Sequence, residues 1–356
     1  MTRVSWNPSG WQRCLGGTVG WLVLIAICGQ VMPPEDLFPA AGILVAILYA
    51  QSVSFSIGFG GVATFGNQAF YGAGGYLVAW LSINASIQNV LLLLLIGLAA
   101  GVVGSSLTVF LVRGQTGFVF GMLTLAIGQT VYEFVSGTGY VGGSGGYAGV
   151  ARGTLLGIDL NNATVFYWFL AVLVAAVTAV LYGVRSSAYG RILSAVRQNA
   201  VRVETLGAPV NRYKGIAVLI SGGLAGVAGA MYAITYGSTD PSMFYWIAGA
   251  APILAGILGG MRTLIGPIVG ATIYGGVLYA FSLQAQIGQL YVSLIVLGIF
   301  LLMPDGVVPA AASGARLVGR RLSALPGAGR QRPPDPPGPP APPGPPARPV
   351  TVERKA

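Results

Sequence analysis

Histidine is absent from this chain of 356 residues, and charged residues make up only 8% of it. Without histidine, neither a Ser-His-Asp nor a Cys-His catalytic arrangement can form. The only lysines are Lys214 and Lys355, and neither follows a glycine-rich phosphate-binding sequence. We therefore exclude ATP binding through a P-loop and expect this chain to carry no catalytic residues.

Cysteine is nearly as scarce, because Cys14 and Cys28 are the only two in the sequence. Two cysteines without histidine form neither a disulfide framework nor a common metal-binding motif. Buried cysteines of this kind usually serve packing. We expect no metal and no cofactor.

What the chain has instead is apolar residues, which make up 54% of it, and 55 glycines. An ordinary soluble domain is about 25% charged, so this composition predicts an all-α polytopic membrane protein in a lipid bilayer. Small residues allow helices to approach closely in lipid. The net charge of +10 would favour nucleic acid in a soluble chain. Here basic loops that fix membrane orientation explain it better, and no nucleic-acid partner is expected.

About ten segments have the composition of spans and lengths near the roughly 20 residues that a crossing helix needs. They are 17–32, 37–54, 56–81, 88–112, 117–136, 163–183, 214–236, 246–260, 264–283 and 287–303. The predicted domains are a leader (1–16), a transmembrane domain (17–304) and a tail (305–356). The proline-rich part of the tail predicts a flexible extension, with a ligand for a proline-binding module as the alternative.

The distribution of charge predicts the orientation. With both termini in the cytoplasm, every Lys and Arg except Arg152 falls on the cytoplasmic side. Glu35, Asp36, Asp159 and Asp240 then fall outside. Since basic loops stay in the cytoplasm, we expect a multi-pass protein with both termini cytoplasmic.

Residues 56–81 (SIGFGGVATFGNQAFYGAGGYLVAWL) are apolar but interrupted by glycines, which predicts a broken helix. Unwound backbone at membrane depth is tolerated where protein or a water-filled cavity surrounds it. The candidate substrate-path residues in this segment are Gly60, Gly61, Thr64, Gly66, Asn67, Gln68 and Phe70. The alternative is close helix packing. For residues 222–230 (GGLAGVAGA), where small residues recur every fourth position, packing is the prediction.

Residues 184–214 are strongly basic, with Glu204 as their only acid. We interpret them as a cytoplasmic loop that contains an amphipathic helix from Ser187 to Leu206. Ser186 or Ser187 would cap the helix, and Gly207 would end it. Its predicted apolar stripe is Ile192, Val196, Asn199, Val203 and Leu206. Such a helix is typical of a docking element, although its arginines can also face anionic lipid.

The only acid expected within a span is Glu133. Carriers that are driven by protons or ions usually hold paired ionisable groups in the membrane. The energy for transport is therefore expected from a partner that contacts the basic segment.

Several motifs in one order resemble a known family. SSAYGRILSAVRQNAVRVETLGAPVNRYKGIAVLISGGLAGVAGAMYA (186–233) is similar to the signature region of LivM-like permease subunits of branched-chain amino acid ABC importers. GFGGVATFGNQAFYGAGGYLVAWL (58–81), VRGQTGFVFGMLTLAIGQ (112–129), VGGSGG (141–146), LGGMRTLIGPIVGA (258–271) and MPDG (303–306) also resemble family elements. The resemblance covers about residues 40–306.

The resemblance implies a transport subunit of the bacterial inner membrane, and not an enzyme. Its implied partners are a second permease subunit, two ABC ATPase subunits and an extracytoplasmic solute-binding protein. The basic segment would then be the coupling helix that an ATPase contacts. The coupling residues that it implies are Gly190, Arg191, Ala195, Arg197, Asn199, Arg202, Glu204 and Gly207.

Substrate identity stays open, because Ala200, Gln129 and Gly145 replace acids that are common in the family. Branched-chain amino acids, urea, amides and other small solutes are all compatible with the resemblance. Two other classes remain: a stand-alone channel or secondary transporter, and a non-transporting membrane scaffold. Neighbouring genes for an ATPase and a binding protein would exclude the first.

Overall fold

The computed structural model describes residues 36–112, 117–155, 157–282, 293–294, 296–298, 301, 303 and 306–311. All of them belong to the unit Met1–Ser313. The predicted leader, the predicted first span and most of the predicted tail lie outside the described residues, as does most of the last predicted span.

The described residues are mainly helical. The long helices are α2 (Leu37–Ser54), α3 (Asn67–Asn84), α4 (Val90–Leu111), α5 (Gly117–Gly137), α6 (Ala163–Ser186), α9 (Val210–Tyr236), α10 (Trp246–Gly259) and α11 (Gly266–Ser282). Shorter helices are the π-helical turn η1 (Phe55–Phe59), α7 (Ala188–Gln198), α8 (Ala200–Thr205) and the 3₁₀ turns η2 (Gly139–Val141), η3 (Gly143–Gly145) and η4 (Pro241–Phe244).

Four two-residue strands complete the structure. β1 (Tyr147–Ala148) pairs antiparallel with β4 (Ser238–Thr239), and β2 (Thr154–Leu155) pairs antiparallel with β3 (Ile158–Asp159). These strands lie in the connections between helices, so the predicted all-α class is confirmed.

Five helical stretches are long and apolar enough to cross a membrane: Leu37–Phe59, Val90–Leu111, Gly117–Gly137, Ala163–Ser186 and Val210–Tyr236. α10 and α11 are shorter apolar helices. A multi-pass membrane protein is therefore confirmed, whereas the described residues do not establish ten spans. The predicted span 214–236 was too short, because α9 already begins at Val210.

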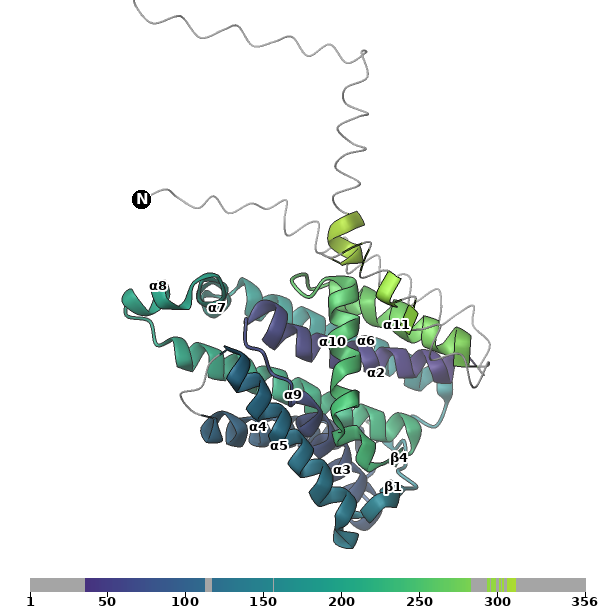
Figure 1. Cartoon of the computed structure of the whole chain (residues 1–356). Helices are drawn as coiled ribbons and strands as arrows, with labels where there is room; N and C mark the ends of the chain where they lie inside the picture. Colours follow the sequence, from purple (N-terminus) through teal and green to yellow (C-terminus); the bar gives the residue numbers. More distant parts are fainter. Residues whose placement is uncertain are drawn as a thin grey trace, which may run out of the picture. The chain divides into compact units, whose positions relative to one another are not determined.

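α9 is the central helix, and it packs against α2, α3 and α4 (Figure 1). Glycines bring the backbones together: a Cβ built on Gly226 of α9 would lie 2.2 Å from the carbonyl oxygen of Gly97 in α4. A Cβ on Gly74 of α3 would lie 2.2 Å from the carbonyl oxygen of Gly226 itself. Three helices thus meet at Gly226, and the packing role predicted for residues 222–230 is confirmed.

The outer helices are much less covered than the central ones. In their most apolar windows, α2 with η1 and α9 are each 72% buried, against 33% for α4 and 28% for α5. The exposed side chains on α4 and α5 are largely apolar, including Phe110 (64% exposed) and Phe118 (69% exposed). In a membrane protein such surfaces face lipid or another subunit.

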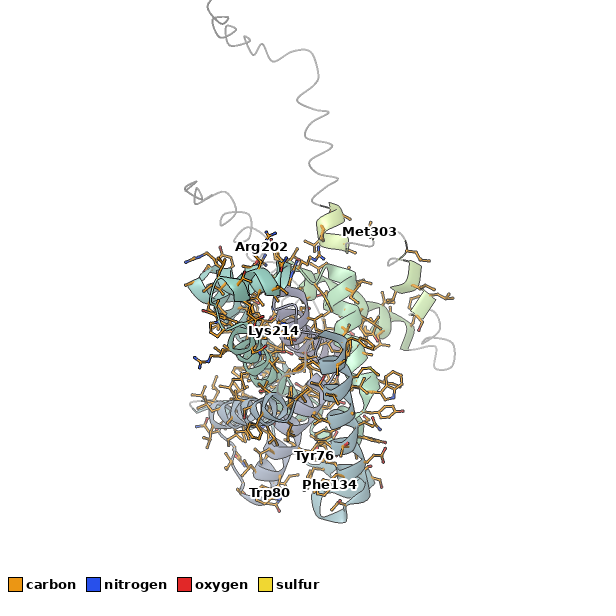
Figure 2. The ribbon with its side chains drawn as sticks, turned by 60° about the vertical axis from the view of Figure 1, so that its left-hand side comes forward. Tyr76, Trp80, Phe134, Arg202, Lys214 and Met303 are labelled. Atoms are coloured by element: carbon orange, nitrogen blue, oxygen red, sulfur yellow. The ribbon has the colours of Figure 1, made fainter. Side chains whose placement is uncertain are left out.

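The two ends of the bundle differ in chemistry. α7 and α8 lie at one end, whereas β1 and β4 lie at the other (Figure 1). Arg202 marks the first end, and Trp80 and Phe134 mark the second (Figure 2). We call the end with Arg185, Arg197, Arg202 and Arg262 the basic end. Exposed aromatic side chains near the other end are typical of a membrane interface.

Replacing Gly226 with valine should strongly destabilise the bundle, because the new side chain would meet the backbone of α4 at Gly97 and Gly101. We expect a loss of about 1–3 kcal/mol or more in unfolding free energy, measured by thermal unfolding of the purified protein. Gly276→Val in α11 is the matched control, since among the described residues no atom of another helix lies within 4 Å of a Cβ there. Equal melting temperatures for the two variants would contradict this packing.

Candidate functional site

The basic segment between α6 and α9 forms two helices, so the prediction of one helix from Ser187 to Leu206 was wrong. α7 ends at Gln198, and Asn199 is extended, with φ −158° and ψ 96°. The side chain of Asn199 then accepts a hydrogen bond from the backbone N–H of Arg202 and caps α8. Asparagine favours such a cap over an interior helical position, which is the physical reason for the break.

The predicted apolar stripe does not form, because α8 turns away after Asn199. Of its members only Val196 is buried, at 2% exposure, while Leu206 is 82% exposed. Leu193, which was not predicted, is fully buried. Tyr189 adds a further anchor, since its hydroxyl donates to the carbonyl oxygen of Tyr213 in α9 at 2.9 Å. α7 is therefore fixed to the bundle and α8 projects from it.

The predicted caps are largely correct. The hydroxyl of Ser187 accepts from the N–H of Gly190, and Gly207 ends the segment with φ +85°. A Cβ on Gly190 would lie 2.3 Å from the carbonyl oxygen of Arg185, so this glycine allows α7 to turn closely against α6. The other predicted residues that lie exposed on this segment are Arg191, Ala195, Asn199, Arg202, Glu204 and Gly207.

The predicted interruption of the 56–81 segment is confirmed. α2 passes into η1, residues 61–66 have no regular structure, and α3 begins at Asn67. Gly60 N–H donates to the carbonyl oxygen of Phe55 at 2.9 Å, and Gly61 adopts φ +65°. We call residues 60–66 the helix break.

Buried polar side chains surround the helix break. The hydroxyls of Ser56 and Thr64 are 2.9 Å apart, and the Asn67 amide donates to the Thr64 hydroxyl at 3.0 Å. Ser221 of α9 donates to the carbonyl oxygen of Ser52 at 2.8 Å. A polar cluster thus occupies the centre of an otherwise apolar bundle.

Two amide side chains at the start of α3 keep unsatisfied atoms. Within the described part of the chain, Asn67 Oδ1 and both amide atoms of Gln68 are buried and have no hydrogen-bond partner. Gln68 fits between α5 and α10 because Gly128 and Gly249 leave room for its amide. Unpaired buried amides are costly, by roughly 1–3 kcal/mol each, and so mark a position where a polar group is needed.

Gly66 and Phe70, which were also predicted to line the path, lie in packing contacts and not in the polar cluster. A Cβ on Gly66 would lie 2.2 Å from the carbonyl oxygen of Thr124 in α5, so this glycine serves close packing. Phe70 is 2% exposed and packs beside Gly104 of α4. The structure thus brings together Thr64 and Asn67, while Phe70 lies in the apolar core.

Sequence reasoning missed the serines of the polar cluster. Ser52 and Ser56 are four residues apart on an apolar helix, and this spacing is a visible sign of one polar face. Ser221 carried no comparable local signal. Its role depends on the contact between α9 and α2, which lies far outside any sequence window.

Arg197 connects the two predicted sites. From α7 its side chain crosses Gly61, where a Cβ would lie 2.4 Å from Arg197 Cγ. Its guanidinium Nη1 donates to the carbonyl oxygen of Gly58, at the end of η1. Any side chain at position 61 would displace Arg197. The surface segment and the helix break are thereby held in direct contact.

Further arginines gather around this contact. The Arg185 guanidinium lies 5.2 Å from the ring centroid of Phe59. Burial lowers the pKa of Arg197, and the nearby charges of Arg262 and Arg185 lower it further. Arg197 stays protonated at neutral pH because arginine is a very strong base. The basic end is therefore a concentrated positive surface, suited to an acidic partner or an anionic headgroup.

Comparison with known proteins gives consistent matches. Residues 40–304 match the family described as "Branched-chain amino acid transport system / permease component". The high-affinity branched-chain amino acid transport system permease proteins LivM of Salmonella typhimurium and Escherichia coli are each 24% identical over 317 residues, which is 81% of this chain and 73% of each relative. The autoinducer 2 import system permease protein LsrC of Klebsiella pneumoniae is 36% identical over 124 residues, which is 33% of this chain and 36% of LsrC.

Arg197→Ala should loosen the helix break, because it removes a charged hydrogen-bond donor from the end of η1. Such a bond contributes about 1.5–3 kcal/mol, so amide exchange across residues 56–66 should rise roughly tenfold or more. Hydrogen exchange of the purified protein, read by mass spectrometry, measures this. Arg191→Ala is the control, since among the described residues Arg191 donates to the Ser186 carbonyl oxygen and does not contact the helix break. Unchanged exchange in Arg197→Ala would contradict the contact.

Proposed function

Because the chain belongs to the branched-chain amino acid transport system permease family, we propose that it forms the membrane path of an ABC importer together with a second permease subunit. The family predicted from the motifs of residues 186–233 is confirmed. Its members are transport subunits. In our proposal, ATP hydrolysis takes place on two separate ATPase subunits, and an extracytoplasmic solute-binding protein delivers the solute.

The observation that carries this proposal is the contact between Arg197 and the helix break. A partner that moves α7 would move the guanidinium that holds the Gly58 carbonyl oxygen. The break itself has little internal support, because its residues lack the regular hydrogen bonds of a helix. A displacement of α7 is thus passed through Arg197 to the helix break and to the polar cluster around Thr64.

α8 supplies the docking surface in this proposal. Val201 on α8 is 71% exposed, Leu206 directly after α8 is 82% exposed, and Arg202 lies between them in the sequence. Exposed apolar side chains on either side of an arginine suit a groove with an acidic rim on a partner protein. The alternative is an interfacial helix that rests on anionic lipid, for which the same arginines are suited.

The solute path is proposed to pass beside the helix break. Gln68 offers a donor and an acceptor that are unsatisfied among the described residues, and Asn67 offers a further acceptor. A passing solute or water could satisfy these atoms in turn. Broken helices near the membrane centre are a recurrent way to expose backbone and side-chain polar groups to a solute.

We further propose that the basic end faces the cytoplasm of a bacterium, with both termini on that side, in the inner membrane. The concentration of arginine there follows the positive-inside rule. The solute is proposed to be a branched-chain amino acid or a similar small molecule. The partial match to an autoinducer 2 import permease keeps other small solutes within this class.

Arg197→Ala and Gly207→Ala should uncouple ATP hydrolysis from transport in the assembled importer. The first removes the link to the break, and the second strains a residue with φ +85°. We expect solute uptake per ATP hydrolysed to fall at least about tenfold, which corresponds to the roughly 1.4 kcal/mol of a modest lost contact. Uptake and hydrolysis are measured together in reconstituted vesicles.

Arg152→Gln is the control for this experiment, because Arg152 lies outside the basic segment and donates to the Asn161 carbonyl oxygen. Normal coupling in both test variants would argue for a helix that only rests on lipid. Uptake without any ATPase subunit would favour a channel or secondary transporter. Absence of uptake with all partners present would favour a membrane scaffold.

A further inference from the structure

A cavity lies away from the helix break, between α2, α3, α9, α10 and α11. Its volume is about 230 Å³. This is below the roughly 300–1,000 Å³ of pockets for drug-sized ligands, so it suits a solute with few carbon atoms. Five tyrosines line it: Tyr49, Tyr71, Tyr232, Tyr236 and Tyr274.

Four of these tyrosine rings form a continuous wall. Tyr49 and Tyr71 stack with centroids 4.3 Å apart, and Tyr71 meets Tyr232 edge-on at 5.8 Å. Tyr232 and Tyr236 follow at 4.5 Å. The negative faces of aromatic rings attract cations, and the attraction strengthens where water is excluded.

Tyr49 carries a buried, unsatisfied hydroxyl in the wall of this cavity. Tyr49 is 5% exposed, and its hydroxyl is buried without a hydrogen-bond partner among the described residues. Buried hydroxyls are normally paired, so Tyr49 brings an unused donor to the wall of the cavity. This observation is independent of the ring arrangement.

Small residues make up much of the remaining wall and leave the space open. Ala248, Ala251 and Ala255 of α10 line it. Gly42 lets the Tyr236 hydroxyl approach, because a Cβ there would lie 2.5 Å from that oxygen. The alanine-lined side of α10 therefore leaves space for an aliphatic group of a bound solute.

Asp240 lies at the edge of the cavity, at the start of η4. Asp240 accepts from the N–H of Ser242, which itself lines the cavity, and its charge interacts with Tyr71 and Tyr232. None of the described lining residues carries a charge. A negative charge at the edge and neutral aromatic walls favour a cation over an anion.

We propose that the cavity binds a small solute through an ammonium group held against the tyrosine faces, with its aliphatic part against α10. The Tyr49 hydroxyl hydrogen-bonds to a polar atom of the bound solute. The inference rests on the proposed transport function only for the claim that the bound solute is also the transported one.

The test is calorimetric binding to the purified full-length chain in lipid nanodiscs, with empty nanodiscs as blank. The probes are isobutylammonium and isobutyrate, which share an aliphatic body and differ in charge. Isobutylammonium should bind saturably and at least about tenfold more tightly than isobutyrate. Absence of amine binding, or equal binding of the two probes, overturns the proposal.

Two substitutions locate the binding. Ala251→Phe fills the cavity and should weaken amine binding at least about tenfold, whereas Leu254→Phe, on the same helix and not among the lining residues, should not. Tyr49→Phe should raise the melting temperature of the empty protein, because it removes an unpaired buried hydroxyl, yet weaken amine binding about two- to tenfold.

A purely structural tyrosine would not shift stability and binding in opposite directions. Amine binding that survives both Ala251→Phe and Tyr49→Phe overturns the proposed site. If Ala251→Phe does not fold, the binding measured with Tyr49→Phe alone decides whether the site stands. Because ATP is absent from this measurement, intact binding with failed ATP-driven uptake would contradict only the proposed function. Intact uptake without amine binding would contradict only this inference.

Discussion

The hydrogen bond from the Arg197 guanidinium to the Gly58 carbonyl oxygen is the contact on which the rest of the site depends. It exists only because Gly61 has no side chain and adopts a positive φ, so that the arginine can cross the backbone. A charged donor at the end of η1 stabilises a carbonyl group that helix continuation would otherwise satisfy. The surface segment and the buried break therefore form one physical unit.

Two kinds of contact surround that unit, and they differ in how far they can adjust when it moves. Close glycine contacts at Gly226 join α9 to α3 and α4 through backbone atoms, and such contacts allow little adjustment. The polar cluster around Thr64 relies instead on hydroxyl hydrogen bonds, which re-form in new arrangements at small cost. The bundle thus combines a rigid centre with an adjustable polar layer, and Arg197 lies against the adjustable part.

Much of the fold and part of the candidate site were predictable from the sequence, because composition and apolar length determine spans locally. The interruption near Gly61 and the caps at Ser187 and Gly207 followed from residue type in the same way. The break at Asn199 was missed because helical periodicity continued across it, while a side-chain cap competed successfully. Ser221 and the tyrosine cavity depend on contacts between helices that are distant in the chain, which no single-sequence pattern carries.

The most direct test of the account is hydrogen exchange at residues 56–66 in the assembled importer, with and without a non-hydrolysable ATP analogue. If Arg197 transmits the state of the ATPase, the analogue should change exchange across the break at least about fivefold in the native protein, or roughly 1 kcal/mol. The same analogue should have no such effect in Arg197→Ala. If the analogue leaves exchange at the break unchanged in the native protein, or changes it equally in Arg197→Ala, the proposed role of Arg197 is contradicted.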